Sequence, residues 1–326
     1  MIIVTGAAGF IGSNLVAGLN DMGRDDIVLV DHLGSDGKWR NIAKRRFLDV
    51  VFPEDLESRL SALPRADAVF HMGAISSTTA TDADEIVRTN FQFPARLWEW
   101  CTRTGTPFIY ASSAATYCNG AAGFDDLESP THLEKLRPLN LYGWSKHAFD
   151  RWSLARSTAG QAPPFWAGLK FFNVFGPNEY HKGDMQSLVA KNFRGIAAGE
   201  PVTLFKSHRE GIRDGEQLRD FVYVADCVAV MLWLFEQRPS CGLFNLGTGQ
   251  ARSFADLMRA TGKALGREVA LQFRDMPEAI RPNYQYFTQA NMQKLRAIGY
   301  ARSFHSLEEG VADYVGRFLA KDDIYL

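Results

Sequence analysis

The chain has 326 residues and a hydrophobic content of 46%, which is typical of a globular protein with one large core or two packed lobes. Its 36 basic and 37 acidic residues nearly cancel, so the overall charge predicts neither a nucleic-acid partner nor binding to a membrane surface. A strand is expected at the first residues, and no apolar run approaches the ~18 residues of a membrane span. The four cysteines are scattered, so we expect free thiols and no metal site. Together these features predict a cytoplasmic protein.

The first half of the chain alternates short apolar runs with amphipathic segments. We predict buried strands at Ile2–Val4, Ile27–Val30, Ala68–His71 and Phe108–Ala111, and helices near Ile11–Met22, Glu54–Leu63 and Ala83–Thr104. The rhythm continues through a helix near Leu141–Arg156 to a strand near Leu169–Phe172. This alternation predicts an α/β fold built on a doubly wound parallel sheet.

The second half is less regular and predicts a second, smaller α/β lobe. Strands are expected at Pro201–Phe205, Phe221–Val224, Leu243–Leu246 and Val269–Phe273, and helices near Met185–Ala198, Val228–Phe235, Phe254–Leu265 and Ser306–Phe318. We assign residues 1–172 to a dinucleotide-binding domain and 173–326 mainly to a substrate-binding domain. Whether segments near 218–246 return to the first sheet is left open. The polar stretch Ser207–Gln217 predicts an exposed loop.

A glycine-rich turn follows the first strand. Gly6, Gly9 and Gly12 have GxxGxxG spacing and lead directly into the helical pattern of Ile11, Leu15, Val16 and Leu19. In such a unit the glycines permit a tight turn, close approach of a pyrophosphate, and tight packing of the helix, whose N-terminus faces the anion. Strand, turn and helix in this order predict a dinucleotide site, although glycines also serve ordinary packing turns.

The second strand ends at Asp31, where an acidic residue typically binds the ribose hydroxyls of the cofactor and favours NAD. Lys38, Arg40 and Lys44 follow closely, and a cation there is suited to a 2′-phosphate, which favours NADP. Because a basic stretch here can equally be a solvated helix end, composition leaves this choice open.

Tyr142 and Lys146 are four residues apart in a helical segment and therefore share one helix face. A tyrosine with a pKa of ~10 is a weak base at neutral pH, so we expect the Lys146 ammonium and a cationic nicotinamide ring to lower it. Ser113 follows the Phe108–Ala111 strand, at the carboxyl edge where ligands of parallel sheets bind. Together these residues predict a catalytic group.

These motifs, in this order, resemble the extended short-chain dehydrogenase/reductase superfamily over essentially the full length. Further segments carry the likeness: His71 to Ala74, Asn90, Phe172 to Pro177, Arg219 to Asp226 and Asn245 to Gly249. Within this superfamily the chain is most similar to the heptose 6-epimerases, through Ala74 to Thr79, Ser112 to Tyr117, His181 to Gly183 and Tyr284 to Ala290. The resemblance implies a Rossmann fold and a homo-oligomer, with a pentamer as the expected size.

The resemblance also implies an activity. The expected cofactor is NADP, the expected substrate an ADP-activated heptose for the lipopolysaccharide inner core, and the expected reaction inversion at C6 through a transient ketone. Tyr142 is then the base, Lys146 its electrostatic partner and Ser113 the residue that orients the hydroxyl. Lys182 is a second acid/base, which must be partly desolvated to act near neutral pH.

The resemblance implies cofactor contacts from the glycine turn, the strand ends and the catalytic helix: Gly6, Gly9, Phe10, Ile11, Gly12, Asp31, His32, Lys38, Gly73, Ala74, Ile75, Ser76, Ser77, Asn90, Tyr142 and Lys146. It implies substrate contacts from the second half: Asn173, Val174, Lys182, Asp184, Lys191, Phe205, Lys206, Ser207, His208, Arg219 and Tyr284. Three features depart from the family pattern. His32 stands where asparagine is expected, Cys118 replaces a glycine that we expect to be neutral for packing, and the Ser207–Gln217 loop is long.

Three other functions are compatible with a chain of this type. A 4,6-dehydratase needs acidic residues after the strand-end hydroxyl, where this chain has Ala114 and Ala115. A UDP-hexose 4-epimerase remains the main alternative, and it has no need of Lys182. A noncatalytic NADP-binding protein has no need of Ser113, Tyr142 and Lys146 together.

Overall fold

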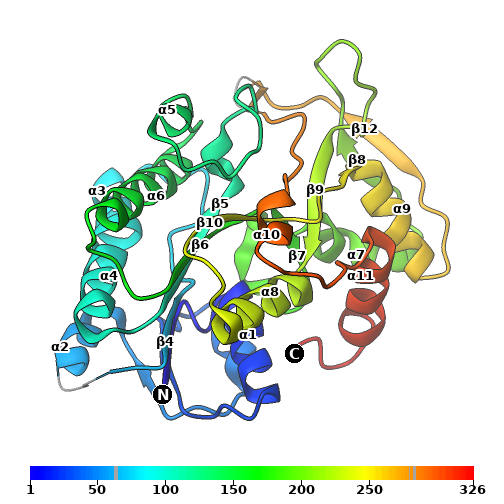
Figure 1. The fold of residues 1–326 in the computed structure, drawn as a ribbon. Helices are drawn as coiled ribbons and strands as arrows, with labels where there is room; N and C mark the ends of the chain where they lie inside the picture. Colours follow the sequence, from blue (N-terminus) through cyan, green and yellow to red (C-terminus); the bar gives the residue numbers. More distant parts are fainter. Residues whose placement is uncertain (62–64, 279, 282–283) are drawn as a thin grey trace.

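The computed structural model describes residues 1–61, 65–278, 280–281 and 284–326 (Figure 1). In this part of the chain the main sheet has seven parallel strands in the order β10-β6-β5-β4-β1-β2-β3. The strands are β1 (Ile2–Thr5), β2 (Ile27–Val30), β3 (Asp49–Val51), β4 (Ala68–His71), β5 (Phe108–Ser113), β6 (Trp166–Phe171) and β10 (Gly242–Leu246). The predicted doubly wound sheet is confirmed, and the chain order reverses between β1 and β4, at its centre.

Helices cover both faces of this sheet, which explains why its inner strands are almost continuously apolar. On one face α1 (Phe10–Asp21) packs against α8 (Val224–Gln237). On the other face lie α2 (Leu56–Ser61), α4 (Phe93–Thr104) and α6 (Leu141–Thr158), with α3 (Ala83–Val87) and the π-helical turn η3 (Arg88–Gln92) leading into α4. Of the helix predicted near Glu54–Leu63, residues 62 and 63 lie outside the described residues.

The second lobe lies to the right in Figure 1 and contains two small sheets. One consists of β7 (Asn173–Phe175), β9 (Leu218–Tyr223) and β11 (Ala251–Ser253), and the other of β8 (Val202–Phe205) and β12 (Leu271–Arg274). Its helices α7 (Leu188–Ala198), α9 (Phe254–Ala264) and α11 (Leu307–Tyr314) share a second apolar core with these strands. β10 and α8 belong to the first sheet and its helical layer, whereas β9 belongs to the second lobe.

The remaining short elements are η1 (Lys38–Ile42), η2 (Pro53–Asp55), η4 (Ala114–Tyr117), α5 (Pro130–Leu133), η5 (Tyr180–Met185), α10 (Gln293–Ala297) and η7 (Val315–Leu319). All four cysteines are free thiols, as predicted. Among the described residues, no helix has the length and apolarity to cross a membrane.

Candidate active site

The glycine turn has the geometry that the sequence predicts. Gly6 has a φ of +64°, and a side chain there would collide with the backbone of Gly73. A side chain at Gly12 would collide with the carbonyl oxygen of Gly6, so α1 can approach the turn closely only with glycine at this position. Gly9 is the N-cap of α1 and supplies no side-chain cap. The backbone N–H groups at the start of α1 are therefore suited to bind a pyrophosphate.

Asp31 and Lys38 form an ion pair beside this turn. One carboxylate oxygen of Asp31 accepts a hydrogen bond of 2.9 Å from the backbone N–H of Ala8. The other lies 2.6 Å from the Lys38 ammonium, which also donates to the carbonyl oxygen of His32 at 2.9 Å. The His32 ring stacks on Phe52 with centroids 5.7 Å apart. The structure thus brings together the acid and the base predicted for the adenosine end.

Two asparagines missed in the sequence attach the turn to the second lobe. Asn41 is buried and donates to the carbonyl oxygens of Ala8 at 2.8 Å and Asn178 at 3.1 Å. Asn178 donates to the Ser13 hydroxyl of α1 at 3.0 Å. Neither residue belongs to a periodic pattern, so the sequence contained no local signal for this contact.

Three of the predicted catalytic residues, Ser113, Tyr142 and Lys146, meet at the carboxyl end of β5. Ser113 ends this strand, and Tyr142 lies in the first turn of α6, where the Asn140 side chain caps the helix by accepting from Gly143 at 2.8 Å. Lys146, one turn later, is 4% exposed and donates to the carbonyl oxygen of Ala111 at 2.8 Å. Strand end and helix start are thus joined as the sequence predicts.

Burial is the main influence on the electrostatics of these residues. Burial raises the pKa of Tyr142, and its hydrogen bond with Ser113 opposes this increase. Burial lowers the pKa of Lys146 to about 8, opposed by the negative charge of Asp150. In the protein by itself, desolvation of the phenol is the largest influence on the Tyr142 pKa, and the expected lowering by Lys146 together with a nicotinamide ring stays a prediction. A cationic nicotinamide ring would act in the opposite direction.

Lys182, the predicted second acid/base, lies in η5 and faces the start of α1. Its ammonium lies 5.4 Å from the centroid of the Phe10 ring, at the start of α1. Burial lowers its pKa, and Glu179 opposes this shift. Lys182 is thus desolvated, as a second acid/base at this position requires. The Glu179 carboxylate is itself buried and accepts from the Ser187 hydroxyl at 2.7 Å.

Asn90 holds the segment Gly73–Ser77 next to the catalytic helix. Its side-chain oxygen accepts from the Ile75 N–H at 2.9 Å, and its amide donates to the Ile75 carbonyl and to the Ser145 hydroxyl, each at 3.0 Å. The predicted contact of Asn90 with the cofactor stays a prediction. Its described bonds position the backbone that follows β4 against α6.

The residues predicted for the nucleotide end form aromatic and ionic contacts in the second lobe. The Arg219 guanidinium lies between two rings, 5.2 Å from the centroid of Tyr284 and 5.5 Å from that of Phe254. Burial lowers the pKa of Arg219. Phe205 packs against the Arg274 guanidinium at 5.1 Å. A flat cation held between rings suits a diphosphate or a base.

The other predicted substrate residues are spread over three segments. Asn173 and Val174 lie in β7. The loop after β8 carries Lys206, Ser207 and His208. The Lys206 ammonium lies 3.5 Å from the Asp275 carboxylate, and Nε2 of His208 lies 3.8 Å from it. Asp184 and Lys191 are exposed and contact each other, since the Lys191 ammonium donates to the Asp184 carbonyl oxygen.

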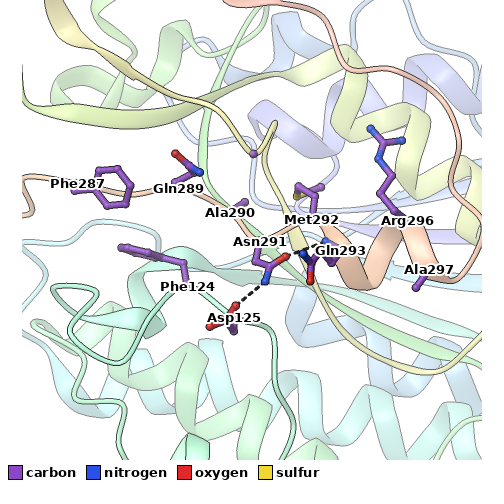
Figure 2. Close-up of a pocket in the computed structure, with 11 residues that line it drawn as sticks. Phe124, Asp125, Phe287, Gln289, Ala290, Asn291, Met292, Gln293, Arg296 and Ala297 are labelled. Atoms are coloured by element: carbon purple, nitrogen blue, oxygen red, sulfur yellow. Dashed lines mark hydrogen bonds between the residues drawn. The ribbon is translucent and has the colours of Figure 1, made fainter.

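A pocket with a volume of about 820 Å³ lies elsewhere (Figure 2). Its walls come from the segment around Phe124 and Asp125 and from residues 287–297, and Asn291 donates to Asp125 at 2.7 Å. None of the predicted catalytic residues lines this pocket. This pocket therefore does not locate the predicted catalytic group, whereas the arrangement of the motifs does.

Comparisons with known proteins agree with the geometry. The model of the NAD dependent epimerase/dehydratase family matches residues 2–247. An ADP-L-glycero-D-manno-heptose-6-epimerase of Fusobacterium nucleatum is 49% identical over 100% of both chains, and one of Nitratidesulfovibrio vulgaris is 47% identical over 100% of both.

Two solved structures are also similar. The ADP-L-glycero-D-manno-heptose-6-epimerase of Helicobacter pylori has a TM-score of 0.78 and 29% identity, covering 97% of this chain and 95% of that one. A Thermus thermophilus UDP-glucose 4-epimerase complex with NAD has a TM-score of 0.73 and 25% identity, covering 97% of each chain. Through its full-length relatives, the chain belongs to the NAD dependent epimerase/dehydratase family and, within it, to the ADP-L-glycero-D-manno-heptose-6-epimerases.

Proposed function

We propose that this protein inverts C6 of ADP-glycero-manno-heptose by transient oxidation to a ketone, using NADP, in the synthesis of precursors of the lipopolysaccharide inner core. Relatives at 47–49% identity over the full chain support the substrate and the reaction. The observation that carries the proposal is the pairing of Ser113, Tyr142 and Lys146 at the end of β5 with a desolvated Lys182 beside Phe10. This combination supplies two acid/base groups from different segments.

In this mechanism Tyr142 takes the proton from the C6 hydroxyl while Ser113 orients that hydroxyl. A bound nicotinamide supplies the hydride acceptor and donor. Lys146 stabilises the phenolate and holds its own position through the Ala111 carbonyl oxygen. Once the ketone has rotated, its oxygen faces Lys182. Lys182 then donates a proton to this oxygen as the hydride returns to C6. The reaction therefore consumes no cofactor.

The family establishes a nicotinamide dinucleotide as cofactor, and the residues near the turn support NADP. The start of α1 offers open N–H groups to the pyrophosphate, and Asp31 is suited to the ribose hydroxyls. Lys38 lies 2.6 Å from this acid, close enough to neutralise it beside a 2′-phosphate. The Gly73–Ser77 segment, held by Asn90, then lies along the cofactor.

For the substrate, Arg219 binds the diphosphate, with the Tyr284 ring and the loop from Phe205 to His208 around the nucleotide. Asn173, Val174, Asp184 and Lys191 border the sugar. The division into residues 1–172 and 173–326 is part of the same proposal, with β10 and α8 as the segments that return to the first sheet. The proposal also includes a cytoplasmic location and assembly into a homo-oligomer.

A UDP-hexose 4-epimerase is the second candidate, because a structure of that activity shares the fold at 25% identity. The two are separated by assaying purified protein with ADP-heptose and with UDP-galactose, using NMR to follow each epimer. We expect turnover with ADP-heptose and little with UDP-galactose. Lys182→Met should reduce turnover by roughly 10²-fold or more, as for loss of a general acid/base, and should retain the cofactor.

Lys263→Met is the matched control, since Lys263 is an exposed lysine of α9 and should tolerate the same change. If Lys182→Met turns over at the parent rate, the two-base mechanism is wrong. Turnover of UDP-galactose alone would replace the proposed substrate.

A further inference from the structure

A buried ion pair that the mechanism above does not use lies next to the catalytic strand end. Asp150 of α6 and Lys170 of β6 are 0% and 1% exposed, and the ammonium lies 2.6 Å from the carboxylate. Two hydroxyls complete the carboxylate shell: Ser112 donates at 2.8 Å and Tyr110 at 3.0 Å. Because such a pair loses most of its attraction to desolvation, its contribution to stability is small. Its geometry points to another role.

The pair connects the two segments that carry Ser113, Tyr142 and Lys146. Asp150 lies on α6, the helix of Tyr142 and Lys146, and Ser112 directly precedes Ser113. Lys170 donates a second hydrogen bond, of 2.8 Å, to the Thr116 hydroxyl, and Thr116 donates to the Ser113 carbonyl oxygen at 2.9 Å. The network therefore has one end on the catalytic helix and the other on the backbone of Ser113.

We propose, on the basis of the function proposed above, that Asp150 and Lys170 are positioning residues for the reaction, holding Ser113 in register with the helix of Tyr142 and Lys146. Thr116 transmits this position to the backbone of Ser113. The pair is also neutral as a unit. The effects of its two charges on the pKa values of Tyr142 and Lys146 therefore have opposite signs.

This neutrality has an electrostatic consequence. The Asp150 carboxylate acts to raise the pKa of both Tyr142 and Lys146. Other titratable groups around the pair come from each element packed against it: Tyr110 of β5, Tyr117 of η4, His147 of α6, and Asp126 and Glu128 from the segment before α5. Removing one member of the pair changes the local charge, whereas removing both leaves it unchanged.

The test compares Asp150→Asn, Lys170→Met and the double variant by the pH dependence of kcat for ADP-heptose. The acid limb follows ionisation of Tyr142. Without Lys170 the remaining anion should shift this limb to higher pH, and without Asp150 the remaining cation should shift it to lower pH, each by at least about 0.5 pH unit. The double variant should return towards the parent value. Equal limbs in all three folded, cofactor-containing proteins would overturn the proposal.

A milder change covers the case in which these variants fail to fold. Thr116→Val keeps the shape and removes the hydroxyl, so kcat should fall at least about fivefold with KM unchanged, whereas Thr116→Ser should restore it. Parent kcat in Thr116→Val would overturn the proposal. Lys44→Met, which breaks the exposed pair with Asp323 away from this network, is the control for loss of an ion pair.

A readout without substrate separates this inference from the proposed function. The ultraviolet titration of Tyr142, taken as the difference from Tyr142→Phe in each background, should show the same opposite shifts. If the parent protein fails to epimerise ADP-heptose and these shifts persist, the function is wrong and the positioning role stands. If the parent is active and the shifts are absent, the proposed function stands and the positioning role is wrong.

Discussion

The Lys146 ammonium donates a hydrogen bond of 2.8 Å to the carbonyl oxygen of Ala111, two residues before Ser113. This bond attaches the catalytic helix to the strand that carries the hydroxyl-orienting residue. Lys146→Met should therefore affect more than the charge near Tyr142. We expect a loss of at least roughly 10²-fold in turnover together with weaker retention of the cofactor, whereas Tyr142→Phe should lose turnover alone. Cofactor absorbance and NMR rates distinguish the two, and full cofactor content in Lys146→Met would contradict the expectation.

In the proposed function, we expect the preference for NADP to depend on the contact between Lys38 and Asp31. Lys38→Ala leaves the acid without its cation, so repulsion of a 2′-phosphate should increase and the preference for NADP over NAD should fall by roughly tenfold or more. The measurement is the ratio of the two dissociation constants, with Lys44→Ala as a control, because Lys44 instead contacts Asp323 at 2.7 Å. An unchanged ratio in Lys38→Ala would assign the selectivity to other residues.

His147 of helix α6 should make the free energy of unfolding depend on pH. Burial lowers its pKa to about 4, and its Nδ1 atom has no hydrogen-bond partner. The unfolded chain binds a proton at a pKa of about 6.5 and the folded chain does not, so stability is lost as pH falls from about 6.5 towards 4. His147→Leu should remove this loss, by about 1–3 kcal/mol at pH 4. Urea unfolding at neutral and acidic pH measures the free energy of unfolding of both proteins. An equal loss of this free energy between the two pH values in parent and variant would refute the prediction.

Cys118 is strained, contrary to the expectation of neutral packing. It has a φ of 60° and a ψ of −127°, a region that glycine adopts readily and other residues rarely do. Cys118→Gly should therefore stabilise the protein by about 1 kcal/mol, despite the greater freedom of glycine in the unfolded chain. Thermal unfolding measures this change, with Cys241→Gly as a control at an exposed thiol without positive φ. A lower melting temperature for Cys118→Gly would contradict it.

How much the sequence predicted follows from how local each signal is. The glycine turn and the Tyr142–Lys146 spacing are set within a few residues, and both were found. The strand Asp49–Val51 has only three residues and was missed because it is too short to show a period. Contacts between distant residues were also missed: Asn41 meets Asn178 across 137 positions, and Asp150 meets Lys170 across 20. Only the folded chain brings these groups together.

The most direct test of the account follows the hydrogen at C6. The protein is incubated with ADP-heptose in deuterium oxide, and NMR records the configuration and the deuterium content at C6, alongside cofactor absorbance. If the hydride taken from C6 returns to the same carbon, the epimer should form without deuterium at C6 and without accumulation of reduced cofactor. Deuterium at C6, or cofactor reduction in proportion to product, would contradict oxidation and hydride return within one site.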